Sequence, residues 1–450
     1  MSRVIPSKLV AMQKSIGVDS LKEIRPEKIR LAPVRGSGAS YSPGDRVGFR
    51  LPAFSNSMLD QAQTFLSFKV TTNDNGDVIT ATNKLPVFGT GAPLFSRMTV
   101  KSASGLVLED ITSFDVLRRL FTLLDTQPDS ARHEGKFGAN DPDLSMGVVL
   151  TTGWDLTMRF DTGLLSQQMA SYLPLFMMDG GAGYALDIEL TVNTAARALR
   201  FTSAPTAGAY TNIQFKLSDI ALNVSLLRMD ESLCAKFNSI ACDPDEEIRI
   251  PYTTMRAHVA TISSQTSTTR VHETCSSLKR IWACMLDSSQ VLEASRVLAF
   301  IGASSSGAGK VVQSYNYKVG STHVYSEPVQ CTPSNAETLQ HVRNALWLGS
   351  DERPTLAKTG GTTFRSVLAD AGDGAFVTVA SFDYSSEAAQ GVVQGISSST
   401  PIEYTMSLDA TPAANTSHDL TLFAECQYDL VIRRGQVTYE EAKPGSNMVY

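Results

Sequence analysis

The sequence predicts an all-β protein made of two consecutive eight-stranded jelly rolls, with short inserted helices and an N-terminal arm. The chain has 450 residues, more than the roughly 250–300 that a single hydrophobic core usually spans. Its 49 serines, 40 threonines, 31 glycines and 19 prolines suit short strands joined by turns. The same order of predicted elements also occurs twice, with roughly 200 residues in each copy, which is typical of two sandwiches in series.

Composition and charge exclude several classes of protein. The chain is 42% hydrophobic and only 19% charged, which argues against a disordered protein. No apolar run approaches the ~18 residues of a membrane span. The first residues, interrupted by Lys8 and Lys14, lack the apolar core of a signal peptide. The net charge of −6 argues against sequence-specific nucleic acid binding. We therefore expect a soluble protein made in the cytoplasm.

Residues 1–44 are predicted to form a basic arm that differs from the rest of the chain. Residues 1–35 contain eight Lys or Arg and three Asp or Glu, a balance of +5 that leaves −11 for the remainder. Residues 9–16 have apolar side chains at helical spacing, and Pro26 ends a second short helical piece. The Gly- and Ser-rich residues 35–43 then form a linker. The arm should become ordered only against a partner or an anionic surface.

The first jelly roll is predicted over residues 45–242. Apolar residues on one face predict a helix over 114–124, a polar loop follows at 125–143, and a further helix is expected over 230–240. The strands of this roll are expected at 47–51, 65–70, 98–101, 106–111, 148–150, 154–160, 185–192 and 213–226.

The second jelly roll is predicted over residues 243–436, followed by a C-terminal tail over 437–450. The acidic connector 242–247, with the sequence CDPDEE, marks the boundary between the rolls because a strand there would need apolar alternation. A helix is expected over 334–346, again after a hairpin. The strands are expected at 248–252, 257–262, 278–285, 315–319, 322–327, 376–382, 402–408 and 420–432.

A search for catalytic chemistry predicts no site. The small residues at 302–310 look like a phosphate loop, but Ser304 stands at the first glycine position and Val311 replaces the magnesium-binding hydroxyl. The six histidines have no metal-ligand spacing, and the acidic run 243–247 is better explained as a solvated linker than as a cation site. Paired carboxylates of the glycosidase kind stay open, because they come together only in the fold. We predict no catalytic, cofactor-binding or metal-binding residues, and no enzyme.

The cysteines predict no cross-link or metal site either. Six cysteines stand at positions 234, 242, 275, 284, 331 and 426, and no pair has the spacing of a zinc knuckle or a redox motif. We expect them to be small buried thiols of a protein kept in a reducing compartment.

Several segments in both predicted rolls have residue patterns that are typical of one known family. In the first roll they are FRLP at 49–52, TFLSFKV at 64–70 and LFSRMTVK at 94–101, which leads to LEDI at 108–111. In the second roll, IRIPY at 248–252 resembles the opening strand. Together these segments resemble the double jelly-roll major capsid proteins of double-stranded DNA viruses. The closest similarity is to polinton-like viruses and to relatives of the nucleocytoplasmic large DNA viruses, and the resemblance spans most of residues 45–436.

The resemblance implies a structural protein of the virion. Members of this family form homotrimers whose six jelly rolls give a pseudo-hexagonal capsomer, and these capsomers tile an icosahedral shell. The implied partners are neighbouring capsomers, penton and minor capsid proteins, and an internal membrane reached through the N-terminal arm; no cofactor is implied. The low charge suits large contacts between subunits.

Two other functions fit a β-sandwich chain. One is a jelly-roll protein that binds or hydrolyses glycans, because one fold can host many functions. The other is a viral receptor-binding spike, an alternative supported mainly by the amino-acid composition. Neither explains an internal duplication preceded by a basic arm, so we favour the capsid hypothesis.

Overall fold

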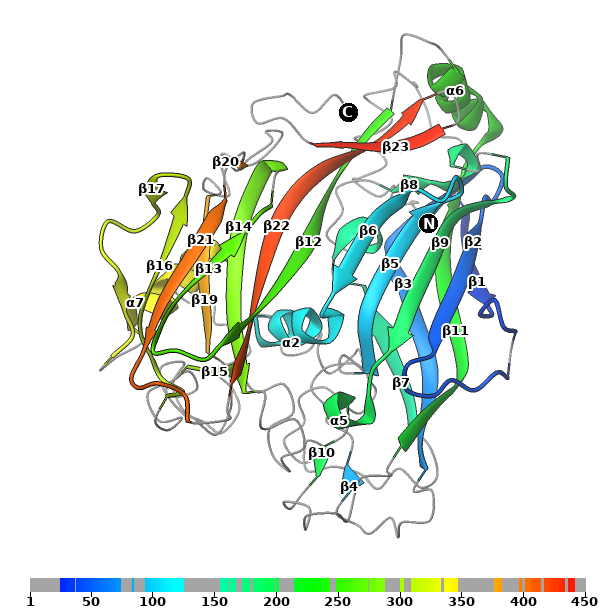
Figure 1. Cartoon of the computed structure of the whole chain (residues 1–450). Helices are drawn as coiled ribbons and strands as arrows, with labels where there is room; N and C mark the ends of the chain where they lie inside the picture. The colour runs from blue at the N-terminus through cyan, green and yellow to red at the C-terminus, as the bar shows by residue number, and fades with distance from the viewer. Residues whose placement is uncertain are drawn as a thin grey trace, which may run out of the picture.

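The computed structural model contains the two predicted jelly rolls, side by side (Figure 1). All described strand pairs are antiparallel. The structure describes residues 25–36, 38–73, 83–84, 94–124, 154–160, 162–166, 172–178, 181–198, 200–201, 214–242, 248–273, 275–287, 300–302, 309–332, 336–346, 376–382, 396–398, 401–413, 417–433 and 436–441.

The first roll consists of two facing sheets. Sheet 1 has the order β1 (Arg25–Leu31), β11 (Gln214–Arg228), β3 (Ser57–Asn73) and β7 (Trp154–Arg159), with β8 (Leu173–Pro174) beside β3. Sheet 2 has the order β2 (Arg46–Pro52), β9 (Tyr184–Val192), β5 (Phe95–Ser102) and β6 (Val107–Thr112). The short strands β4 (Asn83–Lys84) and β10 (Arg200–Phe201) pair with each other.

The second roll repeats this plan. Sheet 3 has the order β12 (Ile248–Ile262), β22 (His418–Arg433) and β14 (Cys275–Asp287); β15 (Phe300–Ile301), β19 (Val377–Ser381) and β20 (Ile396–Ser398) pair with β14, and β23 (Gln436–Glu441) pairs with β22. Sheet 4 has the order β13 (Thr266–Val271), β21 (Ile402–Leu408) and β16 (Val312–Val319), which pairs with β17 (Thr322–His323) and β18 (Val329–Gln330).

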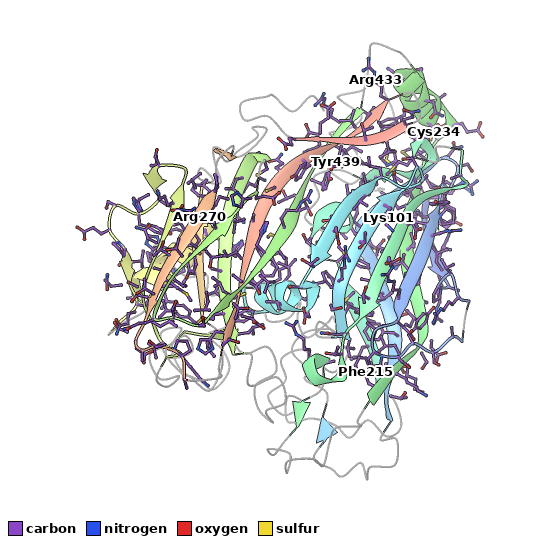
Figure 2. All side chains as sticks on the ribbon, viewed as in Figure 1. Lys101, Phe215, Cys234, Arg270, Arg433 and Tyr439 are labelled. Atoms are coloured by element: carbon purple, nitrogen blue, oxygen red, sulfur yellow. The ribbon has the colours of Figure 1, made fainter. Side chains whose placement is uncertain are left out.

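The two rolls share one strand order. Eight main strands of each roll can be numbered 1 to 8 along the chain. They are β1, β2, β3, β5, β6, β7, β9 and β11 in the first roll, and β12, β13, β14, β16, β17, β19, β21 and β22 in the second. In both rolls one sheet then has the order 1-8-3-6 and the other 2-7-4-5. This is the arrangement of eight strands in two Greek keys that defines a jelly roll. In each roll, side chains from the facing sheets fill the space between them, as around Phe215 in the first roll (Figure 2). The predicted fold class and internal repeat are therefore confirmed.

The helices also follow the repeat. Helix α2 (Phe114–Leu124) comes after the β5–β6 hairpin, and α7 (Ala336–Ala345) comes after the corresponding strands of the second roll. Helix α6 (Glu231–Cys242) leads from β11 toward β12, as predicted. The remaining short helices are α5 (Ala195–Ala198), η3 (Gly163–Leu165) and η4 (Leu175–Met177).

The structure corrects both predicted ends of the folded region. Residues 25–31 belong to β1, which pairs with β11 from Arg25 opposite Arg228 to Leu31 opposite Leu222. This part of the predicted arm therefore belongs to the first roll, and the prediction that the roll begins at residue 45 is wrong. Ile29 and Leu31 pack against the core, and this packing stabilises the pairing of β1 with β11. At the other end, the predicted tail is wrong for residues 437–441, because β23 pairs with the last part of β22.

One further expectation changes, and several others lie outside the described residues. The strands predicted at 248–252 and 257–262 are one strand, β12, which pairs with β22 without interruption from Ile248 to Ile262. The predicted arm helices before residue 25, the loop 125–143, the strand 148–150, most of the acidic connector and the last nine residues lie outside the part of the chain that the structure describes.

Candidate functional site: the junction between the two rolls

No catalytic or metal centre emerges among the described residues, where no group of three or more His, Cys, Asp or Glu side chains could hold a metal ion. The described end of the phosphate-like loop already binds a carboxylate of this chain. The backbone N–H groups of Gly309 and Val311 donate to Oδ1 of Asp409, at 2.9 and 3.1 Å. These amides serve the loop's own fold. No helix in the described residues is long and apolar enough to cross a membrane.

A network of buried polar and apolar groups lies where the two rolls meet. β6 is at one edge of sheet 2, and β12 is at one edge of sheet 3. An exposed sheet edge presents unpaired backbone groups, so folded proteins cover such edges. Here each roll covers an edge of the other, and the junction joins the rolls into one body (Figure 1).

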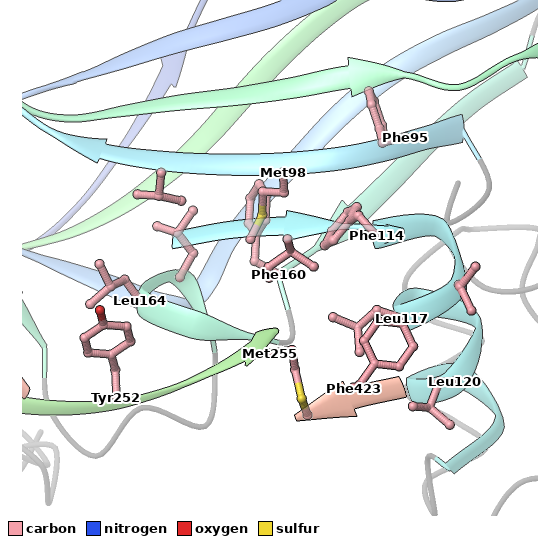
Figure 3. Close-up of a cluster of buried hydrophobic side chains, with 14 of the residues drawn as sticks. Phe95, Met98, Phe114, Leu117, Leu120, Phe160, Leu164, Tyr252, Met255 and Phe423 are labelled. Atoms are coloured by element: carbon pink, nitrogen blue, oxygen red, sulfur yellow. The ribbon is translucent and has the colours of Figure 1, made fainter. Parts of the chain in front are cut away.

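Apolar side chains from both rolls fill this junction (Figure 3). Leu117 and Leu120 of α2 lie beside Phe423 of β22, and all three are fully buried. Met255 of β12 is 3% exposed and lies in the same cluster. The amphipathic pattern that predicts α2 from the sequence therefore belongs to a helix of the first roll whose apolar side chains meet the second roll.

A buried carboxylate holds three elements of the junction together. Glu109 of β6 is 2% exposed, and its Oε1 accepts a hydrogen bond from Oγ1 of Thr254 on β12, at 2.8 Å. Its Oε2 accepts a hydrogen bond from the backbone N–H of Leu164 in η3, at 3.3 Å. One side chain thus links β6 and η3 of the first roll with β12 of the second.

Glycine is required beside this carboxylate. Gly163 has a φ of +71°, in the left-handed region that other residues rarely adopt. A Cβ atom at this position would lie 1.6 Å from Oε1 of Glu109. Gly163 therefore lets η3 approach Glu109 closely enough for the Leu164 N–H group to donate.

Burial changes the acidity of Glu109. Loss of hydration raises the pKa of this carboxyl from 4.5 to about 7, although the hydrogen bonds from Thr254 and Leu164 and the charge of Arg256 act in the opposite direction. The junction therefore contains a group that changes its charge near neutral pH.

A second hydrogen bond crosses the junction next to Glu109. Oη of Tyr252 donates to the backbone carbonyl oxygen of Leu108, at 3.1 Å. Leu108 lies at an irregularity in the β5–β6 pairing, where Val100 is opposite Glu109 but Lys101 is opposite Val107. A bulge leaves a residue outside the ladder, and the Tyr252 hydroxyl supplies the hydrogen bond to its carbonyl group.

A buried carboxylate fixes the helix that faces the second roll. Asp115, in the first turn of α2, accepts a hydrogen bond from Nδ2 of Asn193 at 3.0 Å and lies 3.3 Å from Nε of Arg197. Burial raises the pKa of Asp115, while the charge of Arg197 lowers it. A carboxylate at a helix N-terminus also interacts favourably with the helix dipole. These contacts position α2 for its packing against β22.

Sequence reasoning does not identify this site. Glu109 lies in the LEDI segment that carries part of the family resemblance, but its sequence pattern does not distinguish a buried glutamate from a solvent-facing one. Its partners lie 145 residues away, at Thr254, and 55 residues away, at Leu164. The sequence carries no signal for this burial. In the structure the consecutive residues Leu108 and Glu109 are both buried, which requires cover on both faces of β6.

Comparison with known proteins identifies the fold. No family model and no curated protein matches the chain. Among solved structures, the chain is similar to VP54 of PBCV-1, fitted into a reconstruction of the virophage Sputnik, with 10% identity and a TM-score of 0.61 over 94% of this chain and 97% of that one. It is also similar to the Faustovirus major capsid protein, with 9% identity and a TM-score of 0.55 over 96% and 92%.

The crystal structure of the mavirus major capsid protein gives 8% identity and a TM-score of 0.53, over 99% of this chain and 97% of that one. Each likeness covers both rolls, so the chain has the double jelly-roll fold of these capsid proteins. The predicted resemblance is confirmed at the level of the fold.

Proposed function

We propose that this chain is the major capsid protein of a double-stranded DNA virus. The observation that carries the proposal is the repeated strand order in one chain, together with a likeness that extends over at least nine-tenths of each capsid protein compared. The proposed role is structural, without an enzymatic activity or a cofactor, and the proposed location is the virion, after synthesis in the host cytoplasm.

Three copies of the chain are proposed to form a pseudo-hexameric homotrimer. Heterologous contacts form a closed ring when the rotation between subunits fits, and two similar rolls in each chain then place six rolls around one axis. A rigid junction supports this geometry, because the angle between the rolls must be the same in every subunit. The buried contacts of Glu109, Tyr252 and α2 supply that rigidity.

The division of the chain and its partners belong to the same proposal. The boundary is placed at 243–247, between β11 of the first roll and β12 of the second. Neighbouring capsomers, penton and minor capsid proteins are the proposed partners of the assembled trimer. The residues before β1 are proposed to contact minor proteins or an internal membrane.

Electron microscopy and light scattering of the purified protein test the proposal. The expected result is a trimer in solution, with a hexagonal outline in projection, which forms larger shells or sheets when salt or crowding favours assembly. Monomers at micromolar concentration with no assembly under these conditions would contradict it. Specific binding to a glycan array by such monomers would favour a glycan-binding protein instead.

A further inference from the structure

Two buried cysteines meet inside the second roll. Cys275 is the first residue of β14, Cys426 lies in β22, and the two are 2% and 0% exposed. Their Sγ atoms are 2.8 Å apart. A disulfide bond joins sulfurs at about 2.0 Å, so a shift of about 0.8 Å would bring them to bonding distance.

The other two cysteines described in the second roll have different surroundings. Sγ of Cys284, on the same strand β14, donates to the backbone carbonyl oxygen of Thr421 at 3.7 Å. Sγ of Cys331 lies 3.4 Å from Oγ1 of Thr338. Cys275 and Cys426 thus form the one cysteine–cysteine contact among the four cysteines described in the second roll, and they are 151 residues apart in the sequence.

We propose that Cys275 and Cys426 form a disulfide bond when the protein meets a small disulfide oxidant such as glutathione disulfide. One thiol, as its thiolate, attacks the oxidant to give a mixed disulfide and one glutathione. The second thiol then displaces the other glutathione. Two S–H bonds break and one protein S–S bond forms. Two electrons reduce glutathione disulfide to two glutathione molecules, which also accept the two protons.

The position of the pair gives the bond a structural consequence. The irregular pairing at the start of β14 has a register shift between Leu278 and Arg280, and on the other side between Cys275 and Leu278. A covalent bond would fix this end of β14 to β22. Cys426 is paired on its other side with Thr254, the residue that binds Glu109 at the junction. The cross-link would therefore strengthen the sheet that carries the second roll's half of the junction.

The surroundings also predict a slow reaction in the folded protein. The contact with Cys275 and burial both raise the pKa of Cys426, and the thiolate is the reactive form. Oxidation should occur during folding or when the start of β14 opens locally. If the protein acts as the proposed shell subunit, it would be assembled reduced in the cytosol and cross-linked after release. The chemistry of the pair does not depend on that function.

Peptide mapping without reduction tests the proposal on the full-length protein. One sample is incubated folded and one is refolded, each in glutathione buffers of increasing oxidised fraction. We expect one linked peptide pair, containing residues 275 and 426, in the refolded sample and more slowly in the folded one. The thermal unfolding midpoint of the oxidised protein should be about 5–15 °C higher than that of the reduced protein, and reduction should reverse the change.

Three variants complete the experiment. Cys275→Ala and Cys426→Ala should each abolish the linked peptide and the oxidation-dependent rise in midpoint, whereas Cys284→Ala, on the same strand, should keep both. The wild-type peptide map identifies the linked residues without the variants, so a variant that fails to fold does not weaken the test. Residues 275 and 426 remaining unlinked in both wild-type samples, or linked to other cysteines, would overturn the proposal.

Discussion

Replacing Glu109 with glutamine should remove a pH dependence from the stability of the junction. The pKa of this carboxyl is about 7 in the folded protein and 4.5 as its ordinary value. The group is therefore protonated more readily when the chain is folded. Its favourable contribution is fully present below pH 4.5 and is lost as the pH rises through about 7.

The size of the effect follows from the two pKa values. One pKa unit corresponds to about 1.4 kcal/mol, so a rise from 4.5 to about 7 gives about 3 kcal/mol over the whole pH range. Glutamine has no charge to bury, and its carbonyl oxygen can still accept the hydrogen bond from Thr254. Its NH₂ group would face the N–H group of Leu164, which costs about 1 kcal/mol at every pH.

Denaturant unfolding of wild type and Glu109→Gln between pH 4.5 and 8.5 measures the difference. The wild type should lose about 3 kcal/mol relative to the variant as the pH rises across this range. Glu189→Gln, in strand β9 of the same sheet, is a control that removes a carboxylate paired with Arg46, 3.3 Å away, in place of Thr254. If the curves of wild type and Glu109→Gln stay parallel across the range, the buried-carboxylate argument is wrong.

Three further perturbations test the fold. Gly163→Ala should lower the stability by at least about 2 kcal/mol in denaturant unfolding, because its Cβ would overlap Glu109 at a φ of +71°; a neutral substitution would contradict that geometry. Phe423→Ala should cost about 3–5 kcal/mol by the same measurement and loosen the contact with α2 in hydrogen exchange, and unchanged α2 protection would count against a shared junction. Deleting residues 2–24 should leave a folded protein, whereas deleting 2–31 should uncover β11 and cause aggregation in light scattering; equal behaviour of the two truncations would refute the role of β1.

The sequence predicts the repeated architecture because most strands have one buried face. β2 and β21 alternate buried and accessible residues in a simple way, and the apolar face of α2 is marked by Phe114, Leu117 and Leu120. β22 differs, because 14 of its first 15 residues are buried. Contacts on both faces bury it, and one of those faces meets the first roll through Phe423.

The junction is harder to predict because its partners come from distant parts of the chain. A buried glutamate, a left-handed glycine and a threonine have no shared sequence signature. Only the fold brings Glu109, Gly163 and Thr254 together, and the pKa of the glutamate depends on that burial. The same limit applies to Cys275 and Cys426, whose sequence spacing carries no signal for a sulfur–sulfur contact.

The first strand changes the meaning of the basic N-terminal segment. Of the +5 balance over residues 1–35, +2 belongs to residues 1–24, +2 to β1 and +1 to Arg35. Most of the excess positive charge therefore lies at or beside a sheet edge. Lysine and arginine on an edge strand disfavour pairing with another chain, and Lys28 and Arg30 of β1 are exposed. The basic character that suggests an anionic partner thus has a second explanation in the solubility of the sheet. Any role of the segment in contacting a partner rests on residues 1–24, whose net charge is only +2.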